Sequence, residues 1–237
     1  MRTVRVARPV AAMILIVLGA GCGSIQLANT RESPAPPLDP VFRTVRIETT
    51  GCGLAPNRTG SGVAIGDGLV VTVAHLVARA DNLVASVGSN EGVDASIAAV
   101  DLTLDLALLR IPPNEIPNIQ MSSANEGTGG LIVGGAASGT APFVVREVVR
   151  LSIEEILGAE RHSRLGYELE AATTTGDSGA GAYDGNNRLI GIVFATGQEG
   201  GSTWITASTE IEDFLAAHDS EDALVECDPE TSRIVVP

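Results

Sequence analysis

From Arg43 onward, short apolar stretches recur along the chain and turn residues separate them. Residues 43–48 alternate between apolar and polar side chains, a period of two that is typical of a half-buried strand. Residues 62–65 and 69–73 flank Gly66-Asp67-Gly68, and this pattern predicts a hairpin around a tight turn. Eight further stretches are candidate strands: residues 83–87, 95–100, 106–111, 131–134, 143–151, 167–172, 189–195 and 203–206.

The spacing of these stretches is typical of an all-β sandwich or barrel. No long amphipathic helix alternates with the strands, which argues against a doubly wound α/β fold. Only the end of the body predicts a helix, where Thr209 and Glu212 form a capping-box pattern before the apolar residues 214–217. Residues 111–130 are rich in Pro, Asn, Ser and Gly, and they divide the body into two β-rich halves of similar size.

Residues 1–21 have the pattern of an export leader, because a segment with three Arg residues precedes an uncharged apolar run. The stretch Leu18-Gly19-Ala20-Gly21-Cys22 resembles a bacterial lipobox, although Gly19 stands where that motif has Leu. Lipidation of Cys22, plain secretion and an uncleaved helix to about Ala28 all stay open, and each places the body outside the cytoplasm. Residues 22–41 contain a Pro-rich run without a hydrophobic period, which predicts a tether.

The chain has 237 residues, of which 44% are hydrophobic, so it can bury a substantial core. Its formal net charge of −14 argues against a nucleic-acid partner and against docking onto an anionic membrane by charge alone. The chain contains no Lys, which excludes Schiff-base chemistry and a P-loop.

Cys52 and Cys227 lie near the two ends of the body. Outside the cytoplasm two such thiols usually pair, so the sequence predicts one disulfide. Two separate buried thiols are the alternative.

Three short stretches carry candidate chemistry. His75 follows an apolar strand, Asp105 precedes another, and Ser178 stands in the turn Gly176-Asp177-Ser178-Gly179. A Ser hydroxyl needs a base to become a nucleophile, and His is the base suited to neutral pH. A carboxylate fixes the tautomer of the His, and backbone N–H groups stabilise the oxyanion. Each residue alone has an ordinary structural explanation, but together they predict nucleophilic catalysis.

Other residues compete for these roles. Asp67 and Asp101 are alternative acids, but Asp67 belongs to a hairpin tip and Asp101 lacks an apolar strand directly after it. His162 and His218 stand in polar sequence, and we expect both to be solvated. An esterase of the α/β-hydrolase type is excluded, because that fold needs Ser before Asp before His and a G-x-S-x-G turn.

Three motifs resemble those of chymotrypsin-fold (trypsin-like) serine proteases: Thr72-Val73-Ala74-His75, Asp105-Leu106-Ala107-Leu108-Leu109 and Gly176-Asp177-Ser178-Gly179. The resemblance covers residues 42–227. Within this family the chain looks most like the actinobacterial, membrane-anchored periplasmic serine proteases of the acid-resistance (MarP-like) type. That closer resemblance rests on Cys52, Cys227 and residues 145–152 and 189–194.

The resemblance implies an all-β fold of two antiparallel six-stranded β-barrels with a short C-terminal helix. Barrel one would span residues 42–120 and barrel two residues 121–217, with residues 228–237 as a tail. It also implies a role for each site residue. His75 would be the general base and acid, Asp105 would orient it, and Ser178 would be the nucleophile. The N–H groups of Gly176 and Ser178 would form the oxyanion hole.

In the family, the residue six before the nucleophile lies at the base of the pocket for the side chain preceding the cut. An Asp there selects Arg or Lys, but this chain has Ala172, followed by Thr173. The opposite wall would come from three residues of the late strand: Phe194, Ala195 and Thr196. Since none of these is acidic, we expect a small or medium apolar residue before the scissile bond. A one-residue shift in the alignment would instead bring Glu170 toward the pocket.

The sequence therefore predicts an exported, membrane-tethered serine endopeptidase of the cell envelope that needs no cofactor or metal. Its partners would be a protein or peptide substrate and, through a lipid or the leader helix, the outer face of the cytoplasmic membrane. Secretion is the alternative location. Ala180-Gly181 stands where the family has Gly-Pro, which keeps open a second hypothesis: the same fold used as a binding or sensing module.

Overall fold

The computed structural model describes residues 37–135, 139–156, 158, 160–197, 201–218, 226–228, 230 and 233–235. These residues belong to a compact unit that starts at Pro36. The expected leader, Cys22 and most of the expected tether lie outside the described residues. No helix in the described part of the chain is long and apolar enough to cross a membrane.

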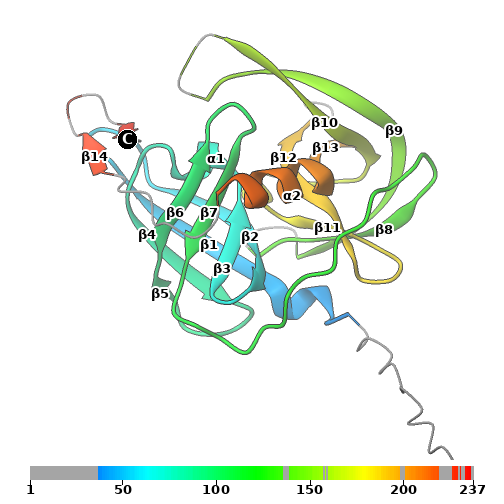
Figure 1. Cartoon of the computed structure of the whole chain (residues 1–237), viewed down its shortest axis with the longest axis horizontal. Coiled ribbons are helices and arrows are strands. Elements are labelled where there is room, and N and C mark those ends of the chain that lie inside the picture. Colours follow the sequence, from blue (N-terminus) through cyan, green and yellow to red (C-terminus); the bar gives the residue numbers. More distant parts are fainter. Residues whose placement is uncertain are drawn as a thin grey trace, which may run out of the picture. The chain divides into compact units, whose positions relative to one another are not determined.

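The first half is a curled, antiparallel seven-stranded sheet in the order β5-β4-β1-β2-β3-β7-β6 (Figure 1). A short 3-10 helix, η1 (Pro40–Arg43), leads into it, and the four-residue helix α1 (Ala74–Val77) follows β3. Its strands are β1 (Thr44–Gly51), β2 (Arg58–Gly66), β3 (Leu69–Thr72), β4 (Ala80–Val87), β5 (Val93–Asp94), β6 (Ser96–Asp101) and β7 (Leu106–Arg110).

The second half is a closed antiparallel barrel in the order β10-β13-β12-β11-β8-β9, and helix α2 (Ser208–Ala217) follows its last strand. Its strands are β8 (Gly129–Val133), β9 (Thr140–Glu154), β10 (Arg161–Glu170), β11 (Gly181–Asp184), β12 (Leu189–Thr196) and β13 (Ser202–Ala207). Farther along the chain, across the expected boundary between the domain and its tail, β14 (Glu226–Asp228) and β15 (Arg233–Val235) form a small hairpin.

The expected fold class is confirmed, because two curled β-sheets and a short C-terminal helix make up the body. The first sheet has a seventh strand because the two-residue β5 pairs with β4, and so short a strand leaves no pattern in the sequence. The expected tight turn joins β2 to β3: Asp67 and Gly68 both have positive φ, at 53° and 72°, as a type I′ turn requires.

The start of helix α2 differs from the expected capping box. The helix begins at Ser208, directly after β13, and no side chain caps its first N–H groups. Extended backbone at Ala207 (ψ 150°) therefore forms the cap position. The Ser208 hydroxyl donates to the Ser122 carbonyl at 2.8 Å, which ties the helix to the connection between the two halves.

One apolar core crosses from the first sheet to the second. Val70, Leu76 and Leu109 of the first half pack in the same cluster as Leu189, Ile192 and Phe214 of the second half, and all six are buried. A separate cluster fills the second barrel around Ile132, Leu169 and Ile205. The shared cluster fixes the two halves against each other, so that loops from both can meet at one place.

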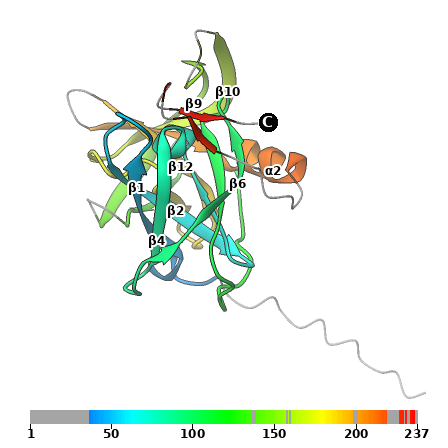
Figure 2. The same cartoon turned by 90° about the vertical axis from the view of Figure 1, so that its left-hand side faces the viewer.

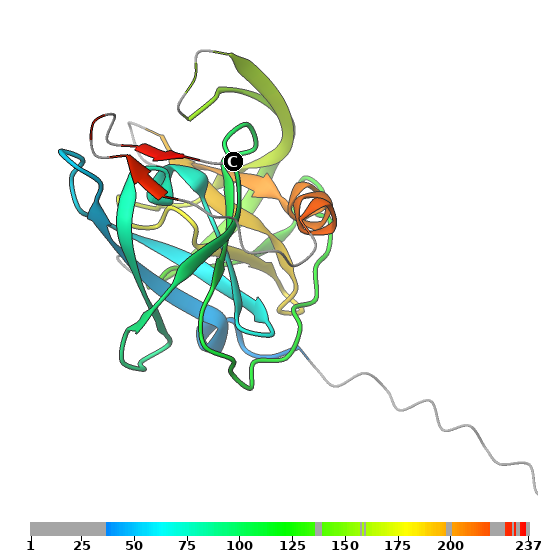
Figure 3. The same cartoon turned by 60° about the vertical axis from the view of Figure 1, so that its left-hand side comes forward.

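The β9–β10 hairpin projects beyond the barrel and curls back toward the first half (Figures 2 and 3). Near its end the N–H of Ile156 donates to the carbonyl of Leu102 at 3.3 Å, in the turn between β6 and β7. The hairpin of the second half thus touches the loop that leads to Asp105.

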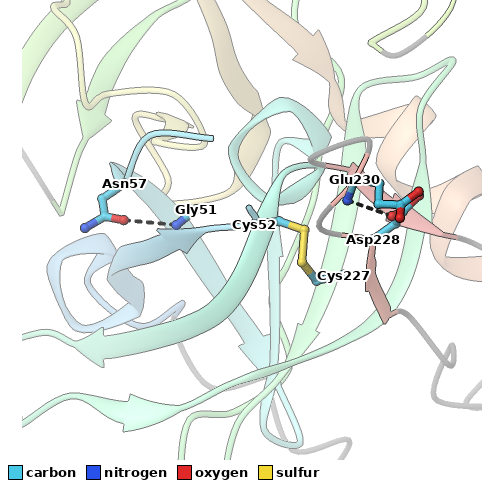
Figure 4. The surroundings of a disulfide bond; sticks show 6 residues. All are labelled: Gly51, Cys52, Asn57, Cys227, Asp228 and Glu230. Carbon is cyan, nitrogen blue, oxygen red and sulfur yellow. Dashed lines mark hydrogen bonds between the residues drawn. A yellow bond between two sulfur atoms is a disulfide. The ribbon is translucent and has the colours of Figure 1, made fainter. Parts of the chain in front are cut away.

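The expected disulfide is confirmed: Cys52 and Cys227 are bonded, with 5.7 Å between their Cα atoms (Figure 4). Cys52 lies in the turn after β1, and Cys227 lies in β14. The bond joins residues 175 positions apart. A cross-link that closes so long a loop stabilises the folded state by about 4–5 kcal/mol in the chain-entropy model.

The turn between β11 and β12 depends on the carboxylate of Asp184. This carboxylate accepts hydrogen bonds from the Arg188 guanidinium at 2.7 and 2.9 Å, from the Asn186 N–H at 2.9 Å and from the Ser122 hydroxyl at 3.1 Å. Burial alone would raise the pKa of Asp184, but these hydrogen bonds lower it below its ordinary value.

A carboxyl group with a lowered pKa in the folded state adds stability above its unfolded pKa of about 4, and this stability disappears as the pH falls through the folded pKa. We predict that the free energy of unfolding of the wild-type protein falls as the pH drops below about 4. In Asp184→Asn the part of this fall that comes from the Asp184 carboxylate should be absent. Urea unfolding at a series of pH values measures it. The same pH dependence in both proteins would contradict the prediction.

Candidate active site

His75 stands in the first turn of α1, directly after the buried strand β3. Its backbone N–H donates to Oδ1 of Asp105 at 2.8 Å, and its ring Nδ1 lies 2.9 Å from Oδ2 of the same carboxylate. Asp105 is buried, while the His75 side chain is 28% exposed. The two contacts fix both the main chain and the ring of His75, and they leave Nε2 for other chemistry.

Asp105 occupies the left-handed region of backbone conformation, with φ of 53°. Asp tolerates this region better than most residues, so the type of residue suits the loop as well as the contact. Of the alternative acids, Asp67 forms the hairpin tip, and Asp101 accepts from the N–H groups of Thr103 and Leu104 at 2.8 and 2.9 Å. Asp101 thereby shapes the loop, and Asp105 contacts the imidazole.

Ser178 lies in a tight turn held from inside by Asp177, whose buried carboxylate accepts from the Thr174 N–H at 2.8 Å. Gly179 follows with φ of 86°, and a Cβ there would lie 1.9 Å from the Ser61 carbonyl oxygen. Only glycine fits this approach, which brings the turn against strand β2. The N–H of Ser61 donates to the Ser178 carbonyl at 2.8 Å, a contact that no sequence motif predicted.

His75 and Ser178 line the same cavity, which has a volume of about 480 Å³. The other residues that line it are Asn57, Arg58, Thr59, Leu76, Thr175 and Gly176. In the described chain the N–H groups of Gly176 and Ser178 donate to no protein acceptor, and no hydrogen bond joins the Ser178 hydroxyl to His75. The hydrogen bond between a catalytic Ser and its His is often long or poorly aligned before a substrate binds.

The five residues expected in the specificity pocket do not line this cavity. Ala172 and Thr196 are exposed, and the other three are half-buried. Thr203 links the two expected walls, because its hydroxyl lies 2.7 Å from that of Thr173 and it pairs with Thr196 in the sheet. The pocket assignment stays a prediction.

Neither of the other histidines lies in the cavity. His218 is half-buried, contrary to expectation: its Nδ1 lies 2.9 Å from the Phe214 carbonyl oxygen, and its ring contacts that of Phe214 in a tilted arrangement with 4.7 Å between the ring centres. It therefore ends helix α2. His162 is half-buried on β10, opposite Ile153 of β9.

Arg164 on β10 also lies at the site, and no motif in the sequence points to it. Its side chain is 1% exposed, and its Nη2 lies 4.0 Å from Oδ2 of Asp105. Its Cζ atom lies 4.1 Å from the centre of the Phe194 ring. Burial lowers the pKa of Arg164 to about 10, against the opposing effect of Asp105, Glu210 and Asp101. In the sequence it is one polar residue of an ordinary strand, so no signal could have found it.

A family model for the trypsin-like peptidase domain matches residues 60–192, more than half of the 237-residue chain. The chain belongs to the trypsin-like peptidase family. Serine protease Rv3671c of Mycobacterium tuberculosis is 29% identical over 164 residues, which are 66% of this chain and 41% of that protein. Serine endoprotease DegS of Haemophilus influenzae is 28% identical over 145 residues, 59% of this chain and 42% of DegS. The trypsin-like chain spans about two fifths of these relatives' length.

Solved structures agree with this assignment. The active form of the Rv3671c protease matches the trypsin-like domain with a TM-score of 0.69 and 26% identity, over 76% of this chain and 82% of that one. The HtrA-type protease AlgW with a tripeptide matches at 0.66 and 20% identity, over 75% and 60% of the two chains, and this likeness shows the fold alone. The expected resemblance to trypsin-like proteases of the MarP-like type is confirmed.

The buried pair of Arg164 and Asp105 makes a testable contribution to the stability of the trypsin-like domain. The guanidinium nitrogens make no hydrogen bond within the described chain, so Asp105 is the nearest compensation for a buried charge. Removing one partner of a buried ion pair destabilises a protein by about 3–5 kcal/mol, whereas replacing the charge by an apolar side chain is often neutral.

We therefore predict that Asp105→Ala lowers the unfolding free energy by about 3–5 kcal/mol and that adding Arg164→Met restores much of the loss. Arg164→Met alone should change stability little, because Asp105 keeps its two hydrogen bonds to His75. Urea unfolding of the three variants measures the coupling. If the stability change of the double variant equals the sum of the two single changes, the two side chains are not coupled and the prediction is wrong.

Proposed function

We propose that this protein is a serine endopeptidase that hydrolyses peptide bonds through an acyl-enzyme. The observation that carries the proposal is the contact of 2.9 Å between His75 Nδ1 and the buried Asp105 carboxylate, beside a cavity that also contains Ser178. A carboxylate on Nδ1 holds the imidazole in the tautomer whose Nε2 accepts a proton. Membership of a peptidase family supports the same conclusion.

In the proposed mechanism, Ser178 Oγ attacks the carbonyl carbon of the scissile bond and His75 Nε2 takes its proton. The N–H groups of Gly176 and Ser178 stabilise the resulting oxyanion. His75 then gives the proton to the leaving amine, and water hydrolyses the acyl-enzyme by the same steps. Asp105 keeps the ring in position and stabilises the imidazolium.

The position of Ala180 supports the catalytic proposal. Its side chain is buried in the core of the second barrel, and its N–H donates to the Asp177 carbonyl at 2.8 Å. The methyl group therefore packs among core residues and does not line the cavity. A binding or sensing module without catalysis is the alternative that the following experiment tests.

A fluorophosphonate probe labels only an activated Ser, so we predict labelling of the wild-type protein and none of Ser178→Ala. His75→Ala should lower kcat by about four orders of magnitude or more, and Asp105→Asn should be nearly as severe because the tautomer is wrong. Labelling of Ser178→Ala, or no labelling of the folded wild-type protein, would contradict the mechanism.

We also propose that the residue before the scissile bond is small or medium and apolar. Ala172, Thr173 and the wall from Phe194 to Thr196 offer no carboxylate, and a buried guanidinium without one meets a desolvation penalty of several kcal/mol. An apolar side chain instead gains about 1.5–3 kcal/mol on burial. Cleavage of a peptide library measures the preference. A dominant preference for Arg or Lys would overturn it.

The leader and the Pro-rich stretch support export and tethering at the outer face of the cytoplasmic membrane. We propose that Cys22 is the lipidated residue. The membrane fraction should then contain a protein of increased mass, and Cys22→Ala should abolish both the mass increase and membrane retention. An unmodified chain found wholly in the medium would favour secretion.

A further inference from the structure

The cavity beside Ser178 lies on the side of the leaving group, if the proposed function holds. His75 must hand its proton to the departing amine, so the segment after the scissile bond passes the His75 side of the site. The cavity is built on that side, from the end of the β1–β2 connection, from α1 and from residues 175–178. None of the residues expected to hold the preceding side chain lines it.

Arg58, the first residue of β2, supplies the charge of this cavity. Its Nη1 donates to the carbonyl of His75 at 2.7 Å, which holds the guanidinium against the wall. The side chain is partly exposed, and among the described residues no carboxylate forms an ion pair with it. Among the residues that the structure describes, no Asp or Glu lines the cavity, although the chain as a whole has a formal net charge of −14.

Two other arginines of the described chain differ from Arg58 in this respect. Arg46 pairs with Glu48 at 2.8 Å, and Arg188 pairs with Asp184 at 2.7 Å. Within the described chain the Arg58 guanidinium donates one hydrogen bond, to a neutral carbonyl, and its remaining N–H groups can donate to another acceptor. A guanidinium held in place binds a carboxylate with two parallel hydrogen bonds at little entropic cost.

We propose that this cavity is a subsite for an acidic side chain in the first two positions after the scissile bond, with Arg58 as the residue that selects it. Leu76 and Thr59 offer walls for the methylene groups of such a side chain, and the Asn57 amide adds a further donor. The substrate class is therefore a protein segment with an apolar residue before the cut and Glu or Asp after it.

Arg58 could instead have a purely structural role, because its hydrogen bond to the His75 carbonyl also supports α1. A support role affects all substrates alike, whereas a selecting role separates acidic from neutral peptides. Binding to Ser178→Ala keeps the test independent of hydrolysis, so that its failure is distinguishable from failure of the proposed mechanism.

The experiment measures the affinity of Ser178→Ala for two blocked peptides by calorimetry. Both have valine before the intended bond, and they carry either Glu or Gln in the two positions after it. We expect the Glu peptide to bind about 10-fold more tightly or better, with a difference that shrinks as salt rises. In the same background, Arg58→Gln should abolish the difference and Arg58→Glu should reverse it.

Arg46→Gln, on the neighbouring strand β1, is the matched control and should keep the preference. Equal affinity of the two peptides for Ser178→Ala would overturn the proposal. So would a loss of affinity in Arg58→Gln that is the same for both peptides, since that is the signature of a support role alone.

Discussion

Ser61 joins the two halves of the molecule at the candidate site. From strand β2 its N–H donates to the carbonyl of Ser178 at 2.8 Å, and its hydroxyl donates to the carbonyl of Gly176 at 2.9 Å. The same hydroxyl accepts from the Gly135 N–H at 3.0 Å. These bonds hold the main chain on both sides of Asp177. These bonds therefore fix the position of the Ser178 turn relative to the sheet that carries His75 and Asp105. The proposed mechanism depends on this fixed position.

The shared apolar core makes this fixed arrangement of the two halves possible. Hydrogen bonds of the Ser61 kind contribute only about 1 kcal/mol each, which would not hold two separate sheets together. The cluster that includes Val70, Leu76, Leu189 and Phe214 buries side chains from both halves, and burial of each such side chain contributes about 1.5–3 kcal/mol. The core thus supplies the energy of association, and the polar contacts select one arrangement.

Charge is distributed unevenly around the site. Two guanidinium groups flank the imidazole–carboxylate pair of an otherwise acidic chain. Arg164 is buried 4.0 Å from the Asp105 carboxylate, and its guanidinium lies away from the cavity, so it acts on the site only through Asp105. Arg58 faces the cavity and has N–H groups available for a ligand. The two side chains are chemically identical, and burial decides their roles: buried Arg164 contacts Asp105, and partly exposed Arg58 is available to bind the substrate.

Much of the fold could be predicted from the sequence, because local rules determine it. The period of two in residues 43–48 and the turn at Asp67 and Gly68 reflect backbone geometry that operates over a few residues. The chemistry of His75, Asp105 and Ser178 restricts which residue types can act together, so the candidate triad was visible as a combination of motifs. The pairing of Cys52 with Cys227 was predicted from the expected export of the chain and from the placement of the two thiols near the ends of the body, and the structure contains this bond.

The remaining features were decided by tertiary structure. Ser61, Arg58 and Arg164 lie far in sequence from the residues that they contact, and a Ser or Arg in a strand has no pattern of its own. The expected capping box is absent because β13 runs straight into α2, so the helix begins at Ser208. The Ser208 hydroxyl donates to the Ser122 carbonyl, outside the helix. Local sequence determines which backbone conformations are favourable. The environment of a polar side chain depends on which distant segment packs against it, and that is known only once the two sheets have closed on their common core.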